Sequence, residues 1–147
     1  MDKGHFEQIY DNYTHMMLFA SSNKLKYENM HQEALEIEKA FNEIIETSDI
    51  EESLNSFKGL KTSLNKMQGE IEAVLYQYRE LDDMLHQVDL IISDYYELDI
   101  EIDLYELNGI ESDLIGVKNE NDKFQELKLS MDSLNGRIDE KINELSS

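Results

Sequence analysis

The sequence contains no proline, no cysteine and no tryptophan, and it has only six glycines in 147 residues. Proline breaks helices and glycine supplies flexible turns, so their scarcity favours long uninterrupted helices. A chain without cysteine forms no disulfide and offers neither a thiolate metal ligand nor a thiol nucleophile. The composition therefore predicts an all-α, elongated protein. The missing disulfides fit a cytoplasmic location and leave a nuclear one open.

Long apolar runs are missing as well. The apolar runs are all short, such as residues 90–92, and none approaches the ~20 apolar residues that a membrane-spanning helix needs. The N-terminus has no basic stretch followed by an apolar run, so we expect no secretory signal. We therefore expect no transmembrane segment, and contact with membranes only through partner proteins.

Basic residues are the third scarce class. The chain has 13 lysines and arginines against 33 acidic residues, which gives a formal net charge of −20. Such a chain repels nucleic-acid phosphates and anionic membranes, so we expect no direct nucleic-acid binding. The imbalance is strongest in residues 80–122, where fourteen acidic residues accompany one basic residue, Lys118. These carboxylates either solvate the outer faces of helices or form an interface for a basic subunit.

Heptad spacing is the strongest positive signal. Apolar residues recur at alternating steps of three and four from Phe57 to Tyr95, which is typical of a helix that packs along one stripe. We predict a long heptad helix over residues 49–108, between helical segments 1–46 and 110–147, in one structural unit arranged as a coiled coil, helical hairpin or bundle. The stripe needs covering helices, in this chain or another. The predicted partner interface consists of Leu64, Met67, Ile71, Val74, Tyr78, Leu81, Leu85, Val88, Ile92 and Tyr95.

Polar stretches interrupt the two flanking segments. In the first, residues 21–24 (SSNK) separate two apolar series and predict a short loop or a phase shift. In the third, Asn121 falls on an apolar stripe, where an asparagine can fix the register of packed helices. The surrounding KNEND equally suggests a solvated helix break.

A turn is predicted near residues 47–49, between the first two helices. Ser48 with Glu51, or Asp49 with Glu52, has the spacing of a helix-capping pair. Either pair places a side-chain acceptor where a new helix has unpaired backbone donors.

Residues 97–110, ELDIEIDLYELNGI, admit two interpretations. Apolar residues alternate with acidic ones, as in a half-buried strand, and Asn108-Gly109 then resembles a hairpin turn. The same residues also form two helical stripes, and the heptad series runs straight into them. We favour helix over strand across residues 97–107, with Gly109 ending the helix as a C-cap.

No spacing in the chain matches a catalytic or ligand-binding motif. The six glycines are isolated, and the four histidines lie far apart without a metal-binding pairing. When Asp99, Glu101 and Asp103 are aligned with a calcium-binding loop, Leu104 stands where that loop needs glycine. We therefore predict no catalytic residue, no cofactor and no metal site.

Residues 78–98, YRELDDMLHQVDLIISDYYEL, carry a more specific pattern, to which Leu98-Asp99 adds a leucine followed by an acid. Its characteristic residues are Tyr78, Leu81, Leu85, Gln87, Val88, Asp89 and Ile91. The pattern resembles the family of subunit two of the biogenesis of lysosome-related organelles complex, small helical proteins shared with the related complex that positions lysosomes. The resemblance implies a non-enzymatic scaffold subunit that assembles with other small coiled-coil proteins on endosomes or lysosome-related organelles.

The sequence thus predicts a non-enzymatic coiled-coil subunit of a hetero-oligomeric scaffold complex, cytoplasmic and active in endosomal trafficking. Two alternatives stay open. One is a kinetochore or cytoskeletal coiled-coil subunit or a self-associating rod. The other is an acidic helical module that folds alone, closes its heptads internally and binds a basic protein.

Overall fold

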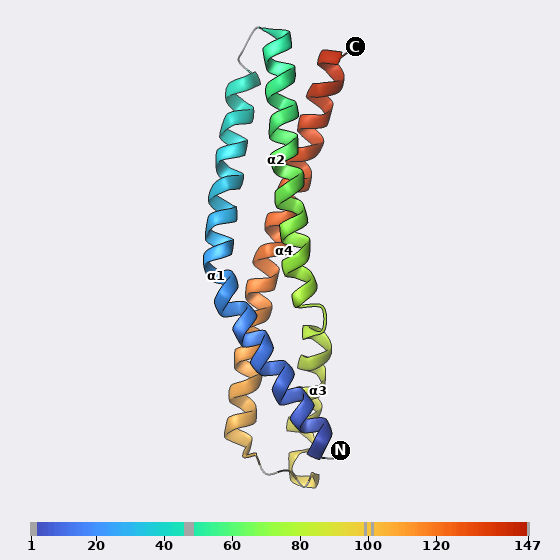
Figure 1. The fold of residues 1–147 in the computed structure, drawn as a ribbon. Coiled ribbons are helices and arrows are strands. Elements are labelled where there is room, and N and C mark those ends of the chain that lie inside the picture. The colour runs from blue at the N-terminus through green and yellow to red at the C-terminus, as the bar shows by residue number, and fades with distance from the viewer. Residues whose placement is uncertain (1–2, 46–48, 99, 101, 147) are drawn as a thin grey trace. The chain divides into compact units, whose positions relative to one another are not determined.

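The computed structural model describes residues 3–45, 49–98, 100 and 102–146 (Figure 1). The predicted all-α class is confirmed, because no strand occurs among these described residues. The helices are long, as expected of a chain without proline, and α1 and α4 each span 43 residues. The elements in order are α1 (Lys3–Ile45), α2 (Ile50–Gln77), α3 (Leu81–Ser93), the 3₁₀ helix η1 (Tyr95–Glu97) and α4 (Leu104–Ser146).

The chain packs as two compact units. Unit 1 comprises Met1–Lys24 and Leu75–Lys123, and unit 2 comprises Leu25–Val74 and Phe124–Ser147. Each unit therefore joins parts of the chain that are far apart in sequence. The order of the helices agrees with the predicted segments 1–46, 49–108 and 110–147. The two units do not coincide with these segments, because each unit groups helices that pack side by side.

Helix α1 runs without interruption through residues 21–24, so the predicted loop or phase shift there is wrong. Steps of four and three continue from Ile9 to Ile44, and Asn23 occupies one of the inward positions. Asn23 is only 5% exposed. The apolar series looks broken because a polar residue holds a core position in a continuous helix.

Asp49 caps the start of α2. Its Oδ1 accepts a hydrogen bond of 3.1 Å from the backbone N–H of Glu52. This contact confirms one of the two predicted capping pairs and satisfies a donor that the first turn of a helix leaves unpaired. Ser48, and with it the other pair, lies outside the described residues.

The predicted long helix over residues 49–108 is broken between α2 and α3. The backbone N–H groups of Tyr78, Arg79 and Leu81 donate to carbonyls three residues back, at 3.0–3.2 Å, instead of four. Residues in such a tightened turn rotate further about the axis than α-helical residues do. The following core positions are therefore reached one residue early, so that Met84 and Ile91 are buried in place of Leu85 and Ile92.

The break is stabilised by Arg79 itself. Its guanidinium Nη1 donates to the carbonyl of Tyr76 at 2.9 Å and lies 3.9 Å from the centroid of the Tyr76 ring. The side chain thus adds a second hydrogen bond to a carbonyl that already accepts from the Arg79 backbone N–H, and it adds a cation–π contact.

The chain leaves the helix again after α3, so the prediction of helix across residues 97–107 is wrong for its first part. Leu98 has extended backbone angles, and Asp103 begins α4 by accepting a 2.7 Å hydrogen bond from the N–H of Glu106. Asn108 and Gly109 then lie inside α4, where no positive φ occurs, so Gly109 is not a C-cap. The alternating pattern contains a helix start rather than a helix end.

Helix α4 also continues through two polar stretches, residues 118–122, for which a break was suggested, and residues 134–137. Residues 118–122 are helical, and Asn121 is half-buried on the flank of the core. Gly136 lies within the same helix. Apolar positions on both sides of each stretch pack inward, which holds the helix across the polar residues.

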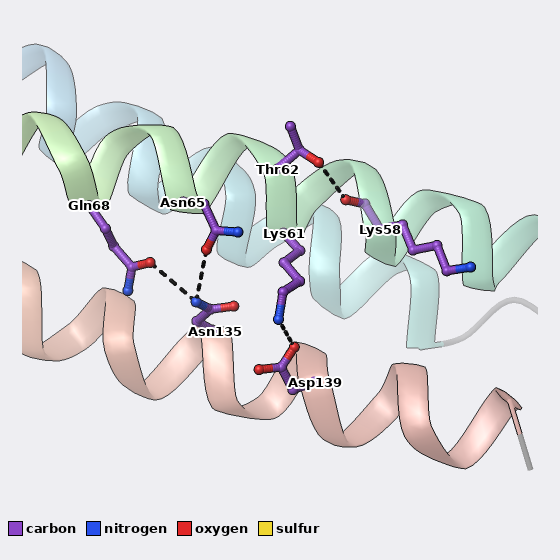
Figure 2. Close-up of polar contacts among 7 residues, drawn as sticks. All are labelled: Lys58, Lys61, Thr62, Asn65, Gln68, Asn135 and Asp139. Atoms are coloured by element: carbon purple, nitrogen blue, oxygen red, sulfur yellow. Dashed lines mark hydrogen bonds and ion pairs between the residues drawn. The ribbon is translucent and has the colours of Figure 1, made fainter.

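Unit 2 contains three helical stretches whose directions follow from their contacts. Figure 2 shows Lys61 of α2 paired with Asp139 of α4, while the Asn135 amide donates to Asn65 and Gln68 at 3.2 Å. Increasing numbers in α2 meet decreasing numbers in α4, so these two helices are antiparallel.

Helices α1 and α4 run in the same direction in unit 2. Tyr27 packs edge-on against Phe124 at 5.3 Å between ring centroids, and Arg137 lies over the ring of Phe41 at 4.8 Å. Both numbers rise together along the two helices. Phe41 also packs against Phe57 of α2 at 5.4 Å and closes the core of this unit.

Candidate interaction surface

The residues predicted to bind a partner are mostly buried inside the chain. Seven of the ten are no more than 3% exposed: Leu64, Met67, Ile71, Val74, Tyr78, Leu81 and Val88. The stripe is therefore covered by helices of the same chain. Leu85, Ile92 and Tyr95 are half-buried instead, because the tightened turn before α3 rotates them away from the core.

Helix α3 carries a mixed acidic and apolar face. Asp82, Leu85, Asp89 and Ile92 follow one another at steps of three, four and three, so they lie along one side of the helix. Both aspartates are exposed and both aliphatic residues are half-buried. This face combines apolar area that a partner can reach with negative charge.

Acidic side chains dominate the outside of unit 1. Among the described residues between 80 and 122, the exposed acidic ones are Glu80, Asp82, Asp83, Asp89, Asp94, Glu97, Asp103, Glu106, Asp113 and Asp122. Lys118 lies 3.5 Å from Asp82, with both side chains open to solvent. One exposed pair of this kind contributes little stability and leaves most of the negative charge uncompensated.

Aromatic side chains accompany the acids where the chain reverses between α3 and α4. The Tyr95 hydroxyl donates to the carbonyl of Ile102 at 2.8 Å, which ties the connection together. Tyr96 and Tyr105 are each 90% exposed. Exposed aromatic rings among carboxylates suit a cationic partner, since ring faces and carboxylates both attract positive charge.

A buried polar cluster lies inside unit 1 beside the α2–α3 break. The Asn23 amide donates to Gln77 Oε1 at 2.9 Å and to the Tyr78 hydroxyl at 2.8 Å. Burial raises the pKa of Tyr78, and the hydrogen bond from Asn23 acts in the opposite direction. Asn23 was not predicted as a core residue, although its distances of three residues from Ala20 and four from Tyr27 continue the inward spacing of α1.

A second tyrosine joins α1 to α4 in unit 1. The Tyr13 hydroxyl donates to Asp113 Oδ2 at 2.5 Å. This hydrogen bond, assisted by burial and by the negative charge of Asp113, raises the pKa of Tyr13 to about 12. The contact orients a carboxylate of the acidic surface toward its own helix neighbour.

Among the described residues there is neither a metal-binding cluster nor a membrane-spanning helix. None of their His, Asp and Glu side chains gather in a group of three that is placed to hold a metal ion. Within the same part of the chain, no helix is both long and apolar enough to cross a membrane. No known protein family, curated protein sequence or solved structure matches the chain.

Proposed function

We propose that the protein is a non-enzymatic helical subunit of a hetero-oligomeric assembly, which binds a basic partner through the acidic outer surface of unit 1. The observation that supports this proposal most directly is the burial of the heptad stripe within the chain. With that stripe covered, a partner meets the exposed carboxylates, the two open tyrosine rings and the mixed face of α3. Complementary charge would select the partner and accelerate its association.

The proposal includes coiled-coil packing of the buried heptad residues. Inward residues at alternating steps of three and four interlock as knobs into holes, as in coiled coils. A rigid bundle of this kind holds its outer side chains in fixed positions, so little conformational entropy is lost when a partner binds.

The resemblance over residues 78–99 narrows the proposed assembly. The resemblance implies a small helical scaffold subunit of the cytoplasm, one that gathers on endosomes or lysosome-related organelles through its partners. In that case several other small helical proteins would be recovered with it in equal amounts. Recovery of a single basic protein would instead favour the acidic binding module.

The test is affinity purification of the tagged full chain from its native cells at physiological salt, with co-purifying proteins quantified by mass spectrometry. A variant of unit 1 neutralises four exposed acids: Asp89→Asn, Asp94→Asn, Glu97→Gln and Glu106→Gln. The matched control neutralises four exposed acids of unit 2: Glu33→Gln, Glu36→Gln, Glu70→Gln and Glu72→Gln.

Both variants change the net charge by the same amount, so they separate a specific surface from general electrostatics. We expect the unit 1 variant to recover at least about tenfold less partner and the control to recover normal amounts. Leu85→Asp should weaken capture as well, because Leu85 lies on the accessible face of α3. Equal recovery by all variants would contradict the proposal.

A further inference from the structure

A groove lies between α1 and α4 in unit 2, on a surface that the proposed function does not use. It has a volume of about 480 Å³. Large aliphatic, small and charged side chains line it, chief among them Ala34, Leu35, Glu38, Leu129, Ser133 and Arg137.

The groove exposes large apolar side chains next to small ones. Leu35 is 47% exposed and Leu129 is 69% exposed, so both leucines project into solvent instead of packing into the core of the unit. Ala34 and Ser133 leave room beside them. A surface with both projecting leucines and small neighbours can receive the leucines of an identical surface.

The two sides of the groove also carry opposite charges. Glu38 lies on α1 and Arg137 on α4, and among the described residues neither forms an ion pair. Arg137 lies over Phe41, and Phe41 is three residues from Glu38, so the two charges lie within about one helical turn of each other along the parallel helices.

We propose that a second copy of this chain covers the groove, with a two-fold axis running along it. That axis places α1 of each copy against α4 of the other, so that Glu38 meets Arg137 twice and Leu35 packs near Leu129 twice. A two-fold interface requires a surface that complements itself, and this groove supplies both the shape and the charges. The protein would then present two acidic surfaces to its partners.

Charge reversal of the purified full chain tests the proposal. Sedimentation velocity should show a dimer at concentrations up to about 100 µM, because association depends on protomer concentration. Glu38→Arg and Arg137→Glu should each raise the dimer Kd about tenfold or more, since each opposes like charges at two places. The double variant Glu38→Arg with Arg137→Glu should restore the dimer at unchanged net charge.

Glu38→Arg makes the strongest comparison, because it lowers the negative net charge and so reduces general repulsion between copies. Loss of the dimer in spite of that change would support the specific contact. A monomeric wild type, or a folded double variant that stays monomeric, would overturn the proposal.

Leucine substitutions test the same interface without disturbing Arg137 and its contact with Phe41. Leu129→Glu should abolish the dimer. Leu25→Glu should leave it intact, because Leu25 is similarly exposed, at 65%, on α1 of the same unit but does not line the groove. Equal effects of the two variants would contradict the proposed interface, and circular dichroism would verify that each variant is folded.

Discussion

Asn23 places a polar amide at a core position of α1, where the other inward residues are apolar or aromatic. Its two hydrogen bonds are directed at Gln77 and Tyr78, next to the break between α2 and α3. A buried amide is costly wherever its hydrogen bonds cannot form, so it favours the one alignment of α1 that supplies its partners. We infer that Asn23 fixes the register of α1 within unit 1.

A double-mutant cycle tests this role of Asn23. Asn23→Ala should lower the free energy of unfolding by about 1–3 kcal/mol, because it leaves the buried Tyr78 hydroxyl without its donor. The same substitution should cost about 0.5–1.5 kcal/mol less in the Tyr78→Phe background, where that hydroxyl is already removed. Urea unfolding of the four proteins gives both values. Additive effects would show that the two side chains do not interact.

Tyr13 makes a prediction about pH. Its pKa is raised from 10.0 to about 12, so the folded chain holds this proton more tightly than the unfolded chain does. The associated stability is fully present below pH 10 and is lost as the pH rises toward 12. Asp113→Asn should move the pKa of Tyr13 back toward 10, because the hydrogen bond to a carboxylate is the largest cause of the shift.

Absorbance of tyrosinate during a base titration measures this change in the pKa of Tyr13. Tyr13→Phe identifies its contribution among the eight tyrosines of the chain. Asp122→Asn is the matched control, since it removes one exposed carboxylate without touching Tyr13. If Asp113→Asn and Asp122→Asn shifted the titration equally, general charge rather than the hydrogen bond would be the cause.

At the scale of the element, the break between α2 and α3 decides which residues of α3 enter the core. Ile91 is fully buried, whereas its neighbour Ile92, which the heptad series places inward, is half-buried. Ile91→Ala should lower the free energy of unfolding by about 2–5 kcal/mol, as expected for a large-to-small change in a core. Ile92→Ala should cost clearly less.

These two substitutions remove the same atoms from adjacent positions, so chemical denaturation of the pair measures the phase of α3 directly. A larger loss of stability for Ile92→Ala than for Ile91→Ala would indicate an uninterrupted heptad helix and contradict the break. Met84 and Leu85 provide an independent pair, because Met84 is 3% exposed and Leu85 is half-buried.

A substitution at Gly109 distinguishes its observed place inside α4 from the predicted role as a helix C-cap. It lies inside α4 without a positive φ, and a Cβ added there meets nothing within 4 Å. Gly109→Ala should therefore raise the free energy of unfolding by about 0.5–1 kcal/mol, because alanine loses less backbone entropy in a helix. At a left-handed C-cap the same substitution would destabilise the protein, so thermal or urea unfolding gives opposite signs for the two accounts.

At the scale of the whole molecule, the net charge of −20 acts against the folded state. Compact chains bring like charges together, and the few exposed ion pairs of the described residues compensate little of this repulsion. Raising sodium chloride from about 0.01 M to about 0.1 M shortens the screening length from about 30 Å to about 10 Å. The free energy of unfolding should rise over this range.

Urea unfolding at several salt concentrations tests that expectation. The unit 1 variant with four neutralised acids should show a weaker dependence on salt, since it carries less of the repulsion. A free energy of unfolding that falls with salt would mean that attractive ion pairs outweigh the repulsion.

Features that depend on neighbours along the chain follow from the sequence alone. Scarce proline and glycine with strong heptad spacing specify long helices. The same spacing marks the apolar stripe that contains Leu64 and Ile71, although these residues were predicted to face a partner and lie buried within the chain. Asp49 is recognisable as a cap because a cap needs only a side-chain acceptor three residues before the donor it satisfies. Periodicity and capping are local properties, so they can be read without knowing which helices meet.

Features that depend on contacts between distant segments follow only from the folded chain. The burial of Asn23 requires its partners Gln77, at the end of α2, and Tyr78, in the turn that follows. The phase of α3 follows from that same tightened turn. Whether a partner or the chain itself covers the heptad stripe is likewise a matter of which helices pack together. Burying an apolar stripe is favourable against any matching apolar surface. The spacing of the stripe therefore shows that it must be covered, but it does not identify the helix that covers it.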